Sequence, residues 1–286
     1  MATVHSTTAP AAVITPGEPR ELSALILRWS ARGLAAMVWL SALLFGIYIL
    51  FFYAGALAVG EMEQWNWVLP RLYDPESPAG TVGIGIHFAT GGVVLALGFI
   101  QLIGPVRDRF PALHRWLGRV YVASSLLAAI GGLVFIATVG TIGGTPMDIG
   151  FGLYGVLMTI AAVQTYRHAR ARRLEVHRAW AIRLFALAIG SWLYRMDYGF
   201  WLILANRLGH HDYFTGPFDR IMAFFFYLPN LAVAEAFIRG RSKTASPPVR
   251  IAASVVLVAA AFLLLVGTYY FCRFYWIPGI ALRIAG

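Results

Sequence analysis

The chain has 286 residues, of which 59% are hydrophobic, and a mean hydropathy of +0.69. Its apolar residues fall in runs of twenty or more, which suit helices that cross a bilayer and are too long for the core helices of a water-soluble domain. The formal net charge of +10 is carried by loops and helix ends, which argues against nucleic-acid binding, and the single cysteine, Cys272, excludes an intrachain disulfide and a paired-cysteine metal site.

The apolar runs predict an all-α membrane domain of seven transmembrane helices over residues 21–286. The predicted spans are 33–57, 81–104, 112–140, 149–166, 179–205, 218–238 and 251–272. Residues 1–20 are rich in Ala, Thr and Pro and carry almost no charge. We therefore expect them to form a flexible cytoplasmic tail and not a cleaved signal peptide.

Lysine and arginine are distributed unevenly between the two sides of this predicted topology. Seventeen of them lie in the amino-terminal segment and around the loops that follow the even-numbered spans, five lie on the other side, and Arg195 lies inside the fifth span. This bias predicts that the amino terminus is cytoplasmic and the carboxyl terminus lies outside. The basic side is also expected to contact anionic lipid of the bilayer.

The second span is rich in glycine and has a polar residue near each end. At 3.6 residues per turn, one helical face carries His87, Gly91, Val94, Gly98 and Gln101. Glycine along that face lets a neighbouring backbone or a flat ligand approach closely. We expect a stripe facing the bundle that is polar at both ends and small in between.

A helical hairpin pattern occurs twice at an offset of 63 residues. Gln101 precedes His114 by thirteen residues, and Gln164 precedes His177 by thirteen, so the offset is 63 for both pairs (164 − 101 and 177 − 114). Each copy has the end of an apolar helix, a basic turn, and a His-Arg pair in the first turns of the next helix. This predicts an internal repeat of two-helix hairpins with a ligand site at one membrane surface. The predicted ligand-binding residues are Gln101, His114, Arg115, Arg119, Gln164, His177, Arg178, Arg183 and Glu235.

The fifth span carries charge far inside an apolar run. Arg195 there needs a carboxylate partner or a water-filled cavity, and the candidate partners are Asp197, Asp148 and Asp219. With His87, which is near the outer end of its span, Arg195 and Asp197 form a predicted outer-side polar cluster.

The sixth span has two features of its own. The pair Pro229-Asn230 in its middle predicts a kink, because proline removes a helical hydrogen bond. Glu235, near the cytoplasmic end, is the natural counter-charge for Arg119 or Arg183.

Two motifs resemble a widespread family of bacterial membrane proteins defined as a domain of unknown function. They are HRWLGRVY at residues 114–121 and HRAWAIR at residues 177–183, the latter fitting the family pattern HRAWxIR, and the resemblance covers residues 81–238. The chain has Ala181 where the family pattern has Met, which leaves the histidine and both arginines of the motif intact. The resemblance implies the fold class, a location in the bacterial inner membrane and the motif residues as candidates for the functional site, but it implies no reaction.

Three functions fit these residues, and a hydrolase is disfavoured because GxSxG and HExxH motifs are absent from the sequence. The first is a cytoplasmic-side pocket that binds an anionic or redox-active ligand, such as a lipid, a quinone or a phosphate-bearing molecule, with transport as an extension. The second is a membrane redox carrier with a single haem b between His114 and His177, whose partners would be a membrane redox protein or a second copy of the chain. The third is a structural membrane protein whose histidines and arginines only cap helices and contact lipid phosphate.

Overall fold

The computed structural model describes residues 18–67, 69–241 and 245–284, and these residues form helices and turns without a strand. The long helices are α1 (Glu18–Ile49), α3 (Pro78–Leu102), α5 (Pro111–Thr138), α6 (Thr145–Arg170), α7 (Leu174–Ala188), α8 (Gly190–Leu204), α10 (Leu228–Gly240) and α11 (Pro247–Phe271). The shorter ones are α2 (Gly55–Ala58), α4 (Gly104–Arg109), α9 (Pro217–Phe225) and α12 (Ile277–Ile284). Turns of π-helix at Leu50–Ala54 and Cys272–Trp276 join α1 to α2 and α11 to α12, and 3₁₀ turns lie at Met62–Trp67 and Asp212–Phe214. Because α1 begins at Glu18, the last three residues of the predicted tail are helical, and the rest of the tail is outside the described residues.

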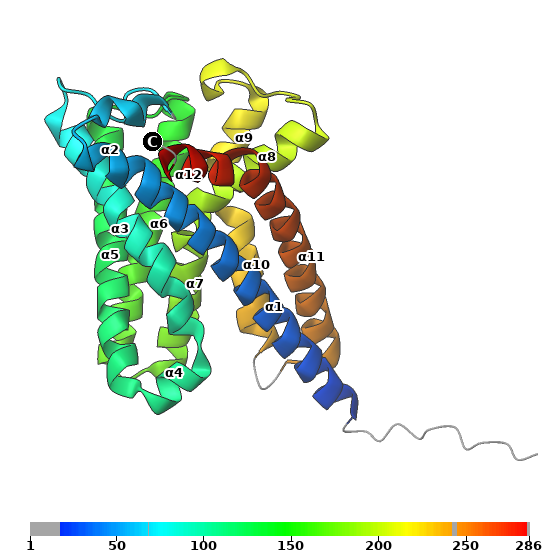
Figure 1. Cartoon of the computed structure of the whole chain (residues 1–286). Coiled ribbons are helices and arrows are strands. Elements are labelled where there is room, and N and C mark those ends of the chain that lie inside the picture. Colours follow the sequence, from blue (N-terminus) through cyan, green and yellow to red (C-terminus); the bar gives the residue numbers. More distant parts are fainter. Residues whose placement is uncertain (1–17, 68, 242–244, 285–286) are drawn as a thin grey trace, which may run out of the picture.

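Six helical segments in the described part of the chain are long and apolar enough to cross a membrane. They are Pro19–Ala58, Pro78–Gln101, Pro111–Thr138, Thr145–Arg170, Pro217–Gly240 and Pro247–Trp276, and each overlaps one of the predicted spans. The remaining predicted span, 179–205, is not one continuous helix. It coincides with α7 and α8, which are separated at Ile189 and are 15 residues long each. Together they lead from the end of the molecule where α4 lies to the region of α9 at the other end (Figure 1).

Four helices form a bundle at the centre of the structure. α3 packs on α5, α5 on α6, α6 on α7, and α7 returns to α3. α1 packs mainly on α11 and also on α3, while α10 lies between α7 and α11. The pair α1 and α11 diverges from the bundle toward the α4 end (Figure 1).

Glycine makes the closest contact inside the bundle possible. A Cβ added at Gly131 of α5 would lie 2.5 Å from the carbonyl oxygen of Gly83 on α3, and one added at Gly83 would lie 2.8 Å from the Gly131 carbonyl oxygen. The two backbones therefore touch at this level, and any larger side chain would push α3 and α5 apart.

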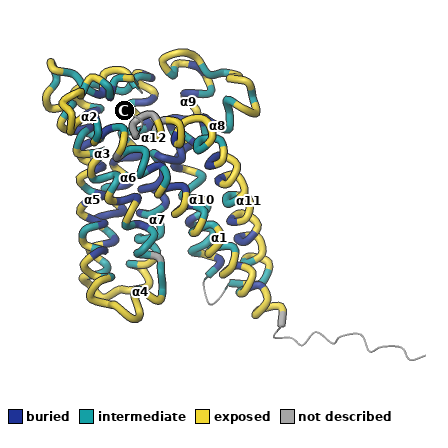
Figure 2. Tube along the Cα trace, viewed as in Figure 1, coloured by how far each residue is buried: buried dark blue, intermediate teal, exposed yellow. Residues whose placement is uncertain are grey.

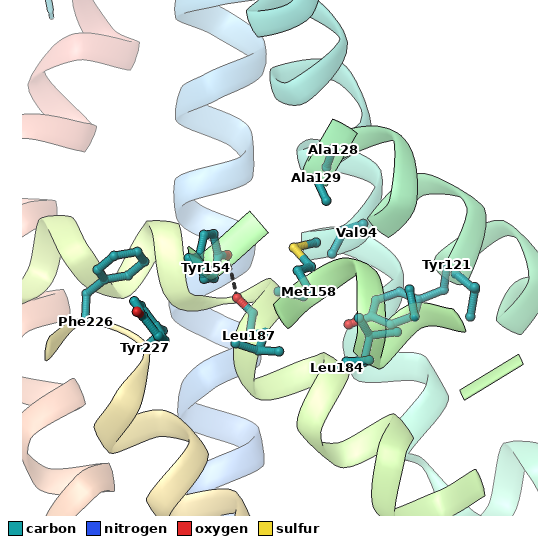
Figure 3. Packing of buried hydrophobic residues seen from close by; sticks show 14 of the residues in the cluster. Val94, Tyr121, Ala128, Ala129, Tyr154, Met158, Leu184, Leu187, Phe226 and Tyr227 are labelled. Carbon is teal, nitrogen blue, oxygen red and sulfur yellow. Dashed lines mark hydrogen bonds between the residues drawn. The ribbon is translucent and has the colours of Figure 1, made fainter. Parts of the chain in front are cut away.

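The bundle interior between its ends is apolar. Val94, Tyr121, Met158, Leu184 and Leu187 belong to one buried cluster to which all four helices contribute (Figure 3). Buried residues concentrate along the helices, whereas α4 and the end loops are largely exposed (Figure 2). Large apolar side chains are exposed on the outward faces of several helices, as expected for surfaces in contact with lipid; examples are Leu127, Ile130, Ile160, Val163, Val255 and Phe262.

Two helix breaks lie next to each other in the middle of the fold. The predicted kink of the sixth span is present: α9 and α10 are separated at Phe226–Tyr227, and the Asn230 side-chain amide donates a hydrogen bond of 2.7 Å to the Phe226 carbonyl oxygen. A Cβ added at Gly190, where α8 begins, would lie 3.2 Å from the Tyr154 ring and 3.6 Å from the Phe226 ring. The chain therefore changes direction twice around Tyr154, which leaves the interior less regular there than in a straight four-helix bundle.

Candidate functional site

The predicted stripe on α3 faces the bundle. His87, Gly91 and Val94 line an internal cavity, a Cβ at Gly98 would lie 3.1 Å from the Tyr121 ring, and the Gln101 Oε1 atom lies 3.2 Å from the position of a Cβ on Gly118. The small residues on each helix thus make room for a polar side chain of the other helix.

Three polar groups at the α4 end of this contact are buried without a hydrogen-bond partner: Gln101 Nε2, His114 Nδ1 and the Tyr121 hydroxyl. Residues 114, 118 and 121 share one face of α5, and Gln101 lies against Gly118, so the three groups fall within about two helical turns. We call Gln101, His114 and Tyr121 the donor cluster. A buried polar group left without a partner costs roughly 1–3 kcal/mol, so three in one place favour an additional acceptor at this position.

His177 lies at the same end of the bundle. Its Nδ1 atom is 2.9 Å from the Thr165 carbonyl oxygen of α6, and because a carbonyl only accepts, Nδ1 donates this hydrogen bond. The charges of Arg107, His177 and Arg115 act on His114, opposed by Asp108. Both predicted histidines therefore lie at the α4 end of the bundle, where arginine charges act on His114. Tyr121, from the same cluster, reaches from α5 toward Leu184 of α7 (Figure 3).

Glu235 is paired with one of its two predicted partners. Arg183 Nε donates to Glu235 Oε1 at 2.6 Å, which ties α7 to α10, and the Arg183 guanidinium lies 4.9 Å from the Trp180 ring centroid. Arg239 approaches the other carboxylate oxygen at 3.8 Å. Arg119 is exposed on α5 and forms no ion pair with Glu235. Arg183 and Glu235 are thus used in joining helices.

The remaining predicted residues of this site are exposed or half-buried. Arg115 and Arg178 are exposed, and Gln164 is half-buried on α6 beside Thr165. Burial lowers the pKa of the Arg241 guanidinium, and Arg107 lowers that pKa further while Glu175 opposes the shift. Arg178 also lies in the field of Arg241 and Arg107. Guanidinium groups from α4, α7 and the end of α10 therefore gather at one end of the bundle.

Two members of the predicted outer-side cluster meet at the cavity. The cavity has a volume of about 50 Å³ and is lined by both His87 and Arg195, whereas Asp197 is not among its lining residues. Arg195 donates from Nη1 to the Ser191 carbonyl oxygen at 3.0 Å, and its guanidinium lies 5.2 Å from the Phe45 ring centroid.

None of the three predicted carboxylate partners pairs with Arg195. Asp148 accepts a hydrogen bond of 2.6 Å from the Thr141 backbone, Asp219 is bound elsewhere, and Asp197 forms no ion pair within the described ranges. The sequence analysis predicted either a carboxylate partner or a cavity for Arg195, and the structure provides a cavity.

Asp219 anchors the loop between α8 and α9. It accepts hydrogen bonds from the Tyr198 hydroxyl and His210 Nδ1, both at 2.7 Å, and from the backbone N–H groups of His211 and Gly216 at 3.1 and 2.8 Å. The sequence signal for this role was the acidic residue in the first turn after Gly216-Pro217, a position that favours helix capping.

Tyr53 is a cavity residue that the sequence patterns did not single out. It lines the cavity from the π-helical turn after α1, and its buried hydroxyl lies beside Arg195 without an acceptor for its hydrogen among the described residues. It is one of several aromatic residues at the end of the first span, so only the fold distinguishes it from the membrane-interface anchors beside it. Groups of three or more His, Cys, Asp or Glu residues that would hold a metal ion do not occur in residues 18–67, 69–241 and 245–284.

Helices of this length and hydropathy, with apolar outward faces and polar groups confined to the interior and the ends, define an integral membrane protein of the all-helical, multi-pass class. Residues 84–238 match the family described as predicted membrane protein (DUF2306), and the chain belongs to that family. The matched region begins within α3 and ends in α10, so it contains most of the four-helix bundle and both helix breaks, and it leaves α1 and α11 outside. Comparisons with curated proteins and with solved structures gave no match.

Proposed function

We propose that the protein binds the oxyanion of a phosphate-bearing molecule at the α4 end of the bundle, with the donor cluster as its ligands. The convergence of three buried, unpaired polar groups from α3 and α5 is the observation that carries this proposal. An amide N–H, an imidazole N–H and a phenolic hydroxyl can all donate to phosphate oxygens. The ligand would therefore satisfy groups that the protein alone leaves unsatisfied.

Charge around the donor cluster supports an anion. Arg107, Arg115 and Arg178 lie at this end, and their positive field attracts phosphate while leaving the neutral donors to fix its position. Phe110, Leu113 and Trp116 at the start of α5 are exposed at 59%, 46% and 59%. Such side chains suit the membrane interface, so a phospholipid headgroup is the favoured source and a soluble phosphate ester is the other.

The proposed topology has seven crossings in the bacterial inner membrane, with α7 and α8 as the fifth, the amino terminus in the cytoplasm and the carboxyl terminus outside. The excess of seventeen basic residues over five supports it and places the donor cluster on the cytoplasmic side. The hairpins α3–α5 and α6–α7 support the repeat, since each has a histidine near the start of its second helix. They differ at the turn: the first hairpin breaks at Ile103 before α4, while α6 is unbroken as far as Arg170.

Binding of the purified protein to short-chain phosphatidylglycerol and to inorganic phosphate, measured by isothermal titration calorimetry, tests the proposal. The double variant Q101L/Y121F should bind at least tenfold more weakly, and His168→Ala, which removes a histidine at the same end outside the cluster, should bind as the original chain does. Binding of the lipid alone identifies a headgroup site, and binding of both identifies a site for free phosphate. No binding of either, or equal binding by Q101L/Y121F, would contradict the proposal.

A single haem b between His114 and His177 is the second candidate function. The specific observation in its favour is the hydrogen bond from His177 Nδ1 to the Thr165 carbonyl, since metal-bound histidines commonly use their other nitrogen in this way and keep Nε2 for the metal. Absorption spectra of the purified protein in its oxidised and reduced forms decide between the candidates. A Soret band that disappears in both His114→Ala and His177→Ala establishes haem, and its absence from protein produced with sufficient haem excludes it.

A further inference from the structure

The cavity at Arg195 lies between α1 and the four-helix bundle and has no part in the donor cluster. Its walls come from α1, the π-helical turn after it, α3, α5, α6, α7 and α8. Five polar side chains, those of Tyr53, His87, Tyr154, Ser191 and Arg195, share this space with an otherwise apolar lining. The Tyr154 hydroxyl is already used, since it donates to the Leu187 carbonyl oxygen. We call this space the Arg195 cavity.

Arg195 brings a full positive charge into the fold without a negative partner. It donates a hydrogen bond to the Ser191 carbonyl oxygen, contacts the Phe45 ring and interacts with the Tyr53 side chain, and no carboxylate of the described residues forms an ion pair with it. An arginine far inside a membrane helix is costly to bury and for that reason normally has a partner or lines a water-filled cavity. A bound anion would offset the cost of this buried charge. A neutral ligand would offset only part of it.

Tyr53 provides independent evidence for a ligand. The residue is 4% exposed, and its hydroxyl lies beside the Arg195 guanidinium, which can only donate to the hydroxyl oxygen, so the hydroxyl hydrogen has no acceptor among the described residues. The ring is held in place by Phe88, at 4.3 Å between ring centroids, and the backbone carbonyl of Tyr53 accepts a hydrogen bond of 3.1 Å from Trp65. A fixed, buried donor beside an uncompensated cation is the arrangement that binds an oxygen anion.

His87 completes the polar side of the cavity. Its Nδ1 atom lies 2.9 Å from the Ala128 carbonyl oxygen and donates to it. This hydrogen bond fixes the imidazole of α3 against α5, on the polar side of the cavity.

The apolar lining and the size of the cavity restrict the ligand. Phe45, Ile49, Phe88, Val94 and Leu95 face a space of about 50 Å³, which holds a small headgroup and not a fused ring system. The rest of the ligand must therefore extend out of the cavity. α1 packs less extensively on α3 than on α11, so we infer that an apolar chain in the bilayer reaches Arg195 at the boundary between α1 and α3.

We propose that the Arg195 cavity binds the carboxylate of a free fatty acid that enters from the bilayer between α1 and α3. Arg195 binds the carboxylate charge, the Tyr53 hydroxyl donates to one of its oxygens, and the acyl chain lies against the apolar wall. A quinone, which would present a neutral carbonyl to the same groups, is the alternative ligand and is distinguished by the test.

Fluorescence titration of the purified full chain with 11-(dansylamino)undecanoic acid, and separately with its methyl ester, tests the charge requirement. The acid should bind at least tenfold more tightly than the ester. Arg195→Gln should remove this difference by weakening only the acid. Equal affinity for acid and ester, or an Arg195→Gln variant that still prefers the acid tenfold, overturns the proposal.

A pair of glycine variants tests the location without removing a charge. A Cβ at Gly91 or at Gly92 would meet no atom within 4 Å, but only Gly91 lines the cavity. Gly91→Leu should therefore fill the space and weaken binding of the acid at least tenfold, while Gly92→Leu, the same change one residue away, should leave it unchanged. This pair remains decisive if Arg195→Gln does not fold. Equal binding by Gly91→Leu and Gly92→Leu overturns the location, and displacement of the probe by a short-chain quinone but not by unlabelled fatty acid overturns the ligand class.

Discussion

The donor cluster and the Arg195 cavity are two polar regions inside the same four-helix bundle, and they differ in where the charge lies. In the donor cluster the buried groups without partners are neutral, while the nearby arginines are exposed or, as with Arg183 and Glu235, paired. In the Arg195 cavity the charged group itself lacks a carboxylate partner among the described residues, and the Tyr53 hydroxyl beside it has no acceptor there for its hydrogen. The first region can therefore select a ligand by hydrogen-bond geometry, whereas the second depends on the charge of what it binds.

Both regions depend on the close contact between α3 and α5, so breaking that contact should have the largest effect. Gly131→Leu would force a side chain against the Gly83 carbonyl oxygen and should lower the free energy of unfolding by about 3 kcal/mol. It should also weaken the binding of both the phosphate ligand and the carboxylate ligand. Differential scanning fluorimetry of the purified protein measures the loss of stability. Gly152→Leu is the control, because a Cβ at Gly152 meets no atom within 4 Å. Equal stability of the two variants would show that the backbone contact is not required.

The second prediction separates the two regions by charge. Arg195→Gln should weaken binding of the carboxylate probe at least tenfold and leave binding of phosphatidylglycerol or phosphate within twofold, because the donor cluster uses other side chains. Parallel titrations of one protein preparation with both ligands provide the measurement. A parallel loss of both affinities would mean that the regions are coupled or that the fold is damaged.

The third prediction concerns the neutral groups of the donor cluster. Tyr121→Phe removes a buried hydroxyl that has no partner, so thermal stability should stay the same or rise slightly, while affinity for the phosphate ligand should fall about threefold to tenfold. Tyr166→Phe, which changes an exposed tyrosine of α6, is the matched control. A marked loss of stability in Tyr121→Phe alone would indicate that the hydroxyl has a structural hydrogen bond instead of a ligand.

The smallest effect is expected at the ion pair that joins α7 and α10. Glu235→Gln should lower the free energy of unfolding by no more than about 1 kcal/mol, because the Arg183 and Glu235 side chains are 26% and 33% exposed and keep a hydrogen bond in the variant. Binding at both regions should be unchanged. A tenfold loss of phosphate affinity in this variant would place Arg183 and Glu235 among the ligand-binding residues.

Several features of the site could be predicted from the chain because they depend on residues close in sequence. The face shared by His87, Gly91, Val94 and Gln101 follows from helical periodicity, and the structure turns that face toward the bundle. The kink near Pro229 follows from the missing amide hydrogen of proline. The break at Ile189, by contrast, has no proline at that position, and it divides a predicted helix where Gly190 packs against Tyr154 and Phe226.

The sequence by itself determined that this is an all-helical membrane protein, which residues of the second predicted span share a face, and that the His-Arg turns are basic, since hydropathy and periodicity are properties of short segments. Only the tertiary structure decided that Glu235 pairs with Arg183 and not with Arg119, that Arg195 has no carboxylate partner among the described residues, and that Tyr53 stands beside it. These outcomes join residues that are far apart in the chain. They depend on how the helices pack and where they break, because a charge or a hydroxyl acquires its role from the groups that the fold brings within a few ångströms of it.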